Sequence, residues 1–73
     1  MDPRRIRLNR RHSMEMGRLF AQFLEAHPNV ESEIGMTPAE DAAWTAYSAG
    51  LLARHQAERS ALADQIEAEQ RRP

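Results

Sequence analysis

The side chains with the clearest chemical potential in this chain are arginines, and they crowd its N-terminus. Six of the ten arginines lie within residues 1–18, and none lies between Leu19 and Ala53. Because guanidinium groups bind phosphate and carboxylate through paired hydrogen bonds, this segment predicts contact with nucleic acid or an acidic protein surface. The expected contact residues are Arg4, Arg5, Ile6, Arg7, Leu8, Arg10 and Arg11. Five arginines on phosphate would give a log–log salt slope of about −3.5 to −4.5.

The charges of this chain are separated along its length. Residues 1–18 carry six arginines and two acids, a net of +4, whereas residues 19–50 carry five acids and no base, a net of −5. Such a separation of charge indicates the kind of partner that a protein binds and does not indicate its fold. We expect the acidic segment to repel nucleic acid and to dock on basic elements of a partner. The residues assigned to this acidic docking surface are Glu31, Glu33, Glu40 and Asp41.

The three histidines are the other candidates for chemistry. No cysteine accompanies His12, His27 and His55, no two of them have helical i, i+4 spacing, and His55 with Glu58 is a common surface arrangement. We therefore assign no metal ligand and no cofactor, and we expect His27 and His55 to end an apolar stripe. Acid–base catalysis needs groups that converge in a pocket, for which a short helical chain has little room. The sequence predicts a binding protein rather than an enzyme, without a small-molecule substrate.

Residues 1–12 contain dense like charge and only two apolar anchors, so we expect a mobile basic arm that becomes ordered on binding. A first helix should follow at about residues 14–26. Ser13 is its predicted N-cap, and apolar side chains then recur at three- and four-residue steps. Pro28 ends this helix, because the residue before a proline is pushed out of the α region.

A second, longer helix is predicted at about residues 38–70, after a short turn at about 30–34. Thr37-Pro38-Ala39-Glu40 reads as a capping box with proline at the first helical position, and no proline interrupts the residues that follow. The predicted fold class is therefore all-α, a helical hairpin. Its domain organisation is a flexible arm at 1–12, a helical domain at 13–70 and a disordered tail at 71–73.

The unequal lengths of the two predicted helices have a consequence for packing. At 1.5 Å per residue the second helix spans about 45–50 Å and the first about 20 Å. The first helix then covers only half of the second, with Trp44 as the anchor against Phe20 or Phe23. Leu62 and Ile66 are left without an intramolecular partner. The second half should project into solvent or pack against another chain.

Length and composition bound the remaining possibilities. Seventy-three residues make one domain at most, and the lack of cysteine excludes disulfides and thiolate chemistry. No apolar run has the length of a signal peptide or of a membrane span. The expected location is the cytoplasm, without membrane contact.

The size, the RRIRLNRRH segment and the helical layout resemble those of small bacteriophage-encoded transcription regulators that bind host RNA polymerase, of the inhibitor and antiterminator kind made by a Xanthomonas phage. The resemblance implies docking on the polymerase β′ subunit near the RNA exit channel, inhibition of initiation, and antitermination. Beside such a channel, we expect the basic arm to contact nascent RNA or an acidic surface of the polymerase.

Two other functions stay open at this level. One is a nucleic-acid-binding or antitoxin-like homodimer, in which the long helix forms the dimer seam and the arms contact phosphate. The other is a phage structural or adaptor hairpin, which predicts self-association or a virion partner and no effect on transcription. A helix-turn-helix reader is disfavoured, because the second helix begins with Glu40 and Asp41, which would repel phosphate.

Overall fold

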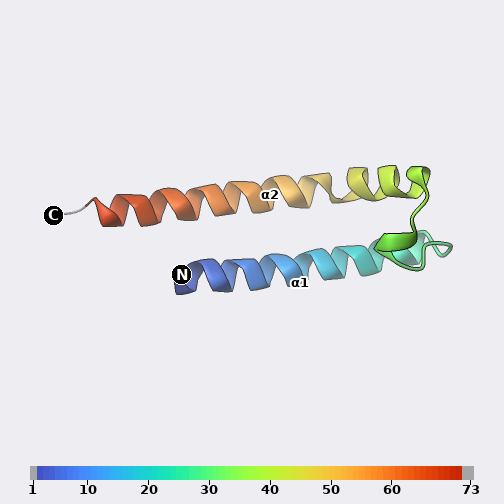
Figure 1. Cartoon of the computed structure of the whole chain (residues 1–73), viewed down its shortest axis with the longest axis horizontal. Helices are drawn as coiled ribbons and strands as arrows, with labels where there is room; N and C mark the ends of the chain where they lie inside the picture. The colour runs from blue at the N-terminus through green and yellow to red at the C-terminus, as the bar shows by residue number, and fades with distance from the viewer. Residues whose placement is uncertain (1, 72–73) are drawn as a thin grey trace.

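The computed structural model is an antiparallel pair of helices joined by one short connection (Figure 1). It describes residues 2–71, apart from the side chain of Glu33. Helix α1 spans Pro3–Ala26, the 3₁₀ turn η1 spans Glu33–Gly35, and helix α2 spans Pro38–Gln70. The all-α helical hairpin is thus confirmed, as are the predicted bounds of the second helix. Within the predicted tail, Arg71 forms the C-cap of α2, and residues 72–73 lie outside the described part.

Helix α1 begins at Pro3, so the predicted start at about residue 14 is wrong. Asp2 is its N-cap and accepts a hydrogen bond from the backbone N–H of Arg4 at 2.8 Å, with Pro3 at the first helical position. Residues 3–12, expected to form a mobile arm, are therefore the first turns of α1. The repulsion among their arginines is offset by α2, where six acids and two arginines give a net of −4 against +4 for α1.

The connection between the helices follows local signals. Helix α1 ends at Ala26, with His27 as C-cap and Pro28 directly after it. Helix α2 starts at a complete capping box, in which the Thr37 hydroxyl accepts from the Glu40 N–H and the Glu40 carboxylate accepts from the Thr37 N–H. Both helix ends next to the loop are as predicted.

The core nearest the loop is aromatic. Phe23 is fully buried, and its ring lies 5.2 Å from that of Trp44 and 5.7 Å from that of Tyr47. Phe20 meets Trp44 edge-on at 5.0 Å, so the predicted role of Trp44 as the anchor against Phe20 and Phe23 is confirmed. Offset and edge-on geometries of this kind add to the stabilisation that burial alone provides.

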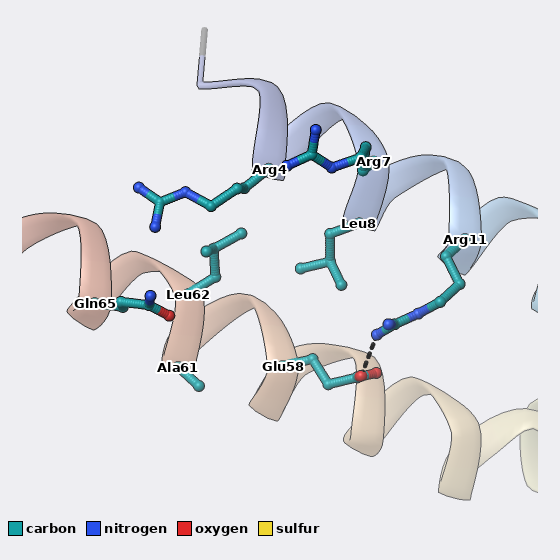
Figure 2. A pocket seen from close by; sticks show the side chains of 8 residues that line it. All are labelled: Arg4, Arg7, Leu8, Arg11, Glu58, Ala61, Leu62 and Gln65. Atoms are coloured by element: carbon teal, nitrogen blue, oxygen red, sulfur yellow. Dashed lines mark hydrogen bonds and ion pairs between the residues drawn. The ribbon is translucent and has the colours of Figure 1, made fainter.

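The second half of α2 is covered by the early turns of α1, so the expectation that Leu62 and Ile66 lack an intramolecular partner is wrong. Ile66 is 8% exposed, and Leu62 and Leu8 are half-buried. Figure 2 shows the side chains of Leu8 and Leu62 between the helices, where they help to line a groove of about 590 Å³. The C-terminal turns of α2 extend beyond the N-terminus of α1 (Figure 1).

Candidate functional site

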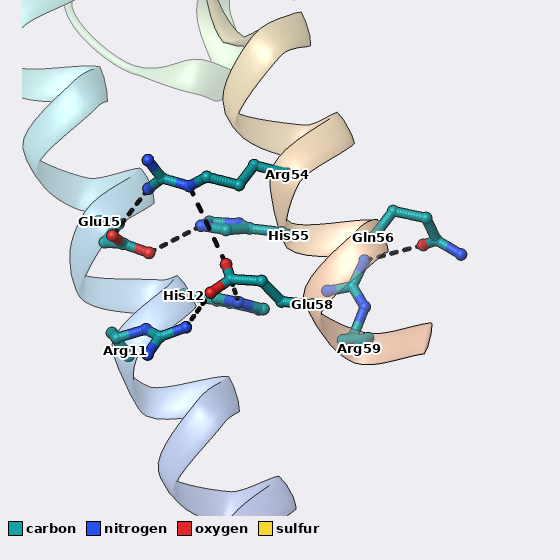
Figure 3. Close-up of polar contacts among 8 residues, drawn as sticks. All are labelled: Arg11, His12, Glu15, Arg54, His55, Gln56, Glu58 and Arg59. Carbon is teal, nitrogen blue, oxygen red and sulfur yellow. Dashed lines mark hydrogen bonds and ion pairs between the residues drawn. The ribbon is translucent and has the colours of Figure 1, made fainter. Parts of the chain in front are cut away.

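The middle of the hairpin contains a cluster of histidine and glutamate side chains drawn from both helices. His12 and Glu15 come from α1, and His55 and Glu58 come from α2 (Figure 3). Nε2 of His12 lies 3.2 Å from Oε1 of Glu58, and Nε2 of His55 lies 2.9 Å from Oε1 of Glu15. The two imidazole rings stack between the helices, with centroids 3.7 Å apart and planes 16° from parallel. We call these four residues the His–Glu cluster.

Two arginines fix the outer oxygens of the carboxylates. Arg54 donates to Oε2 of Glu15 at 2.9 Å, and Arg11 forms an ion pair with Oε2 of Glu58. Each carboxylate thus has one oxygen near a histidine and the other on an arginine, and Oε1 of Glu58 also lies 3.9 Å from Nε of Arg54. The hydrogen bond from His55 holds the pKa of Glu15 below its ordinary value, and the charge of Arg54 adds to this effect.

The imidazoles of the cluster are buried while its carboxylates reach the surface. The side chains of His12 and His55 are 6% and 3% exposed, against 32% for Glu58 and 27% for Glu15. Because a carboxylate accepts hydrogen bonds, Nε2 of His12 donates to Oε1 of Glu58. Nδ1 of the same ring is buried and has no hydrogen-bond partner within residues 2–71. Buried polar atoms without a hydrogen-bond partner are uncommon in folded proteins.

The cluster is encoded by a repeated pattern. Residues 8–19 and 51–62 both follow L-x-x-R-H-x-x-E-x-x-x-L, at positions 43 apart (12 to 55, 15 to 58). In each helix the i, i+3 spacing puts the histidine and the glutamate on one face. Since the helices run antiparallel, the two copies meet reciprocally, and each histidine reaches the glutamate of the other copy.

The sequence-based interpretation did not predict this cluster, because it assigned His55 and Glu58 to the surface and did not pair them with His12 and Glu15. The three histidines have no useful mutual spacing, but two of them stand three residues before a glutamate and directly after an arginine. The signal that reveals the pattern is the internal repeat, which is visible in the amino-acid sequence alone. The repeat does not show that its two copies face each other.

The structure does not bring the predicted contact residues of segment 1–12 together as one patch. Arg4 pairs with Asp2 and with Glu69 at 2.9 Å, and Arg11 pairs with Glu58. Leu8 faces α2 and lines the groove between the helices (Figure 2). The remaining predicted contact residues are Arg5, Ile6, Arg7 and Arg10, which are exposed.

One exposed face of α1 retains the predicted combination of basic and apolar side chains. Ile6, Arg10, Met14 and Arg18 follow one another at four-residue steps and therefore form one stripe along the helix. Ile6 is 41% exposed and Met14 is 59% exposed. Within the described part of the chain, no ion pair involves Arg10 or Arg18. We call this stripe the docking ridge.

Of the residues predicted to form an acidic docking surface, one stabilises the start of α2 and two are exposed to solvent. The carboxylate of Glu40 is used in the capping box, whereas Glu31 in the connection and Asp41 in the first turn of α2 are exposed. The side chain of Glu33 lies outside the described part of the structure. These residues therefore do not all remain available to a partner.

No protein-family model, curated protein or solved structure matches this chain. Neither helix, over residues 2–71, has an apolar stretch of the length that crossing a bilayer requires.

Proposed function

We propose that this chain is a small regulatory protein that acts by contact and docks on a negatively charged macromolecular surface through the docking ridge. The observation that carries the proposal is the alternation of free guanidinium groups with exposed apolar side chains, Ile6 and Met14, along one helix face. Interfaces are enriched in arginine and methionine, because both combine adaptable apolar contact with a specific end group or a polarisable sulfur.

The charge distribution supports an acidic partner. Arg10 and Arg18 have no internal ion pair among the described residues, and Arg7 beside them on α1 is also exposed. Charges of one sign on one face raise the encounter rate with a surface of opposite sign. A rigid helix also loses less conformational entropy on binding than the mobile arm first expected.

Bacterial RNA polymerase is the partner to test first, because the resemblance of the chain to phage-encoded polymerase-binding regulators points to it. In this proposal the ridge binds the polymerase, with the β′ subunit near the RNA exit channel as the expected place, in the bacterial cytoplasm. Binding would inhibit initiation or favour antitermination. Contact with nascent RNA would come from Arg5 and Arg7 rather than from the paired Arg4 and Arg11.

The test compares binding of purified, nuclease-treated bacterial RNA polymerase by the wild-type chain and two double variants. Arg10→Glu with Arg18→Glu reverses the charge of the ridge, whereas Arg59→Glu with Arg71→Glu makes the same charge change on α2 and its C-cap. We expect the ridge variant to bind at least tenfold more weakly, which corresponds to about 1.4 kcal/mol. The control variant should bind as the wild type does, and both should retain the helical circular dichroism of the wild type.

Other results would favour the remaining functions. Retention of nucleic acid but not polymerase, together with a dimer in light scattering, would indicate the nucleic-acid-binding homodimer. Self-association without either ligand would indicate a structural or adaptor hairpin. Equal loss of polymerase binding in both double variants would mean that overall charge, and not the ridge, is responsible, and the proposal would fail.

A further inference from the structure

We infer that the His–Glu cluster is a binding site for a first-row divalent transition-metal ion, with Zn²⁺ as the reference ligand. The inference is independent of the proposed function, because the cluster lies between the helices and shares no residue with the docking ridge. One ligand atom from each of His12, Glu15, His55 and Glu58 lies within 4.8 Å of every other. Four donors from two helices thus converge on one place.

The chemistry of the donors selects the class of ion. Two imidazole nitrogens with two carboxylate oxygens suit Zn²⁺ and its neighbours in the first transition row, whereas Ca²⁺ and Mg²⁺ prefer oxygen ligands alone. Sites for soft ions need sulfur, and neither cysteine nor methionine belongs to the cluster. A single Zn²⁺ bound by all four side chains would be tetrahedral and closed, which is typical of a structural metal site.

The spacing of the donors is close to that of a tetrahedral site. With metal–ligand bonds of about 2.0–2.1 Å, neighbouring donor atoms lie about 3.3 Å apart. The two cross-helix His–Glu distances, 3.2 and 2.9 Å, already approach this value. The stacked rings cannot both hold one ion in their planes, so binding requires them to turn apart. The two cross-helix distances join Nε2 of each histidine to Oε1 of the glutamate on the facing helix, so Nε2 is the ring nitrogen that faces the position of the ion in both histidines.

The surrounding charges permit the ion and limit its affinity. Arg11 and Arg54 bind the Oε2 atoms of Glu58 and Glu15, and an ion at the Oε1 side leaves these two ion pairs in place. The ion would replace only the longer contact of Arg54 Nε with Oε1 of Glu58, at 3.9 Å. The two arginines orient the carboxylates, as residues that hydrogen-bond to metal ligands commonly do. The positive charge of the two guanidinium groups opposes a divalent cation, so we expect micromolar rather than nanomolar affinity. The partly exposed carboxylates provide the entry path.

The experiment titrates the metal-free full-length chain with Zn²⁺ by calorimetry and with Co²⁺ by visible absorption. We expect one ion per chain, a Kd below about 100 µM, and the intense Co²⁺ bands of tetrahedral coordination. The variants His12→Gln and Glu58→Gln should weaken binding at least tenfold. The matched controls His27→Gln and Glu67→Gln, which lie outside the cluster, should leave binding unchanged.

A second measurement uses the wild-type chain and does not depend on whether the variants fold. In NMR spectra of the histidine rings, Zn²⁺ should shift the signals of His12 and His55 and leave those of His27 in place. A Kd weaker than about 100 µM, or a response of His27 equal to that of the cluster, would overturn the inference. So would one ion shared by two chains. None of these results bears on the docking ridge, whose failure would appear only in the polymerase assay.

Discussion

Deleting residues 1–10 should strongly destabilise the hairpin, because these residues are the part of α1 that covers the second half of α2. The deletion removes the half-buried Leu8 and uncovers Leu62 and the buried Ile66. Counting about 2 kcal/mol for Ile66 and about 1 kcal/mol for each half-buried leucine gives about 4 kcal/mol. The lost ion pair between Arg4 and Glu69 adds little, because it lies at the surface. A domain of this size has a total stability of about 4–10 kcal/mol, so much of it would be lost.

Urea unfolding followed by far-UV circular dichroism measures this loss, and hydrogen exchange locates it. Residues 60–70 should lose protection, since a helical segment of that length is marginal without a packed neighbour. A point variant reports on the same contact: Leu62→Ala should cost about 1–2 kcal/mol. The control Leu52→Ala, at a side chain that is 46% exposed, should cost less than about 0.5 kcal/mol. An unchanged unfolding midpoint and unchanged protection after the deletion would show that residues 1–10 are a passive arm.

Two further outcomes are expected. Phe23→Ala should lower the free energy of unfolding by about 3–5 kcal/mol, because it empties the one fully buried side-chain position among residues 2–71. Unfolding followed by Trp44 fluorescence measures this loss, and a cooperative transition at the wild-type midpoint would contradict it. The hydrogen bonds from Arg4 lower the pKa of Asp2 to about 2 and also lower the pKa of Glu69. Since these folded-state values lie below the unfolded ones, the stabilisation is complete above about pH 5 and is lost as the pH falls toward 2. Thermal unfolding between pH 7 and pH 3 should therefore show a smaller decrease in Arg4→Gln than in the wild type, and equal decreases would refute the assignment.

Much of the fold was predictable because its signals are local. The bounds of α2 follow from the capping box at Thr37 and Glu40 and from the absence of proline, and the end of α1 follows from Pro28. The contact of Trp44 with the phenylalanines follows from one apolar stripe on each helix. The start of α1 also has a local signal, Asp2-Pro3, but the density of like charge in the residues that follow predicts a mobile arm, so the two signals disagree.

The sequence predicts which side chains of the candidate site share a helix face, but it does not predict which faces meet. The repeated R-H-x-x-E pattern determined that each helix would present a histidine and a glutamate on one face with an arginine beside them. The contact of His12 with Glu58, 46 positions away, depends on the antiparallel register. In that register the aromatic side chains pack near the loop, and Arg4 and Arg11 of α1 pair with Glu69 and Glu58 of α2. Local sequence fixes which side chains share a helix face, because helical geometry has a fixed period, whereas the pairing of two faces is a property of the whole folded chain.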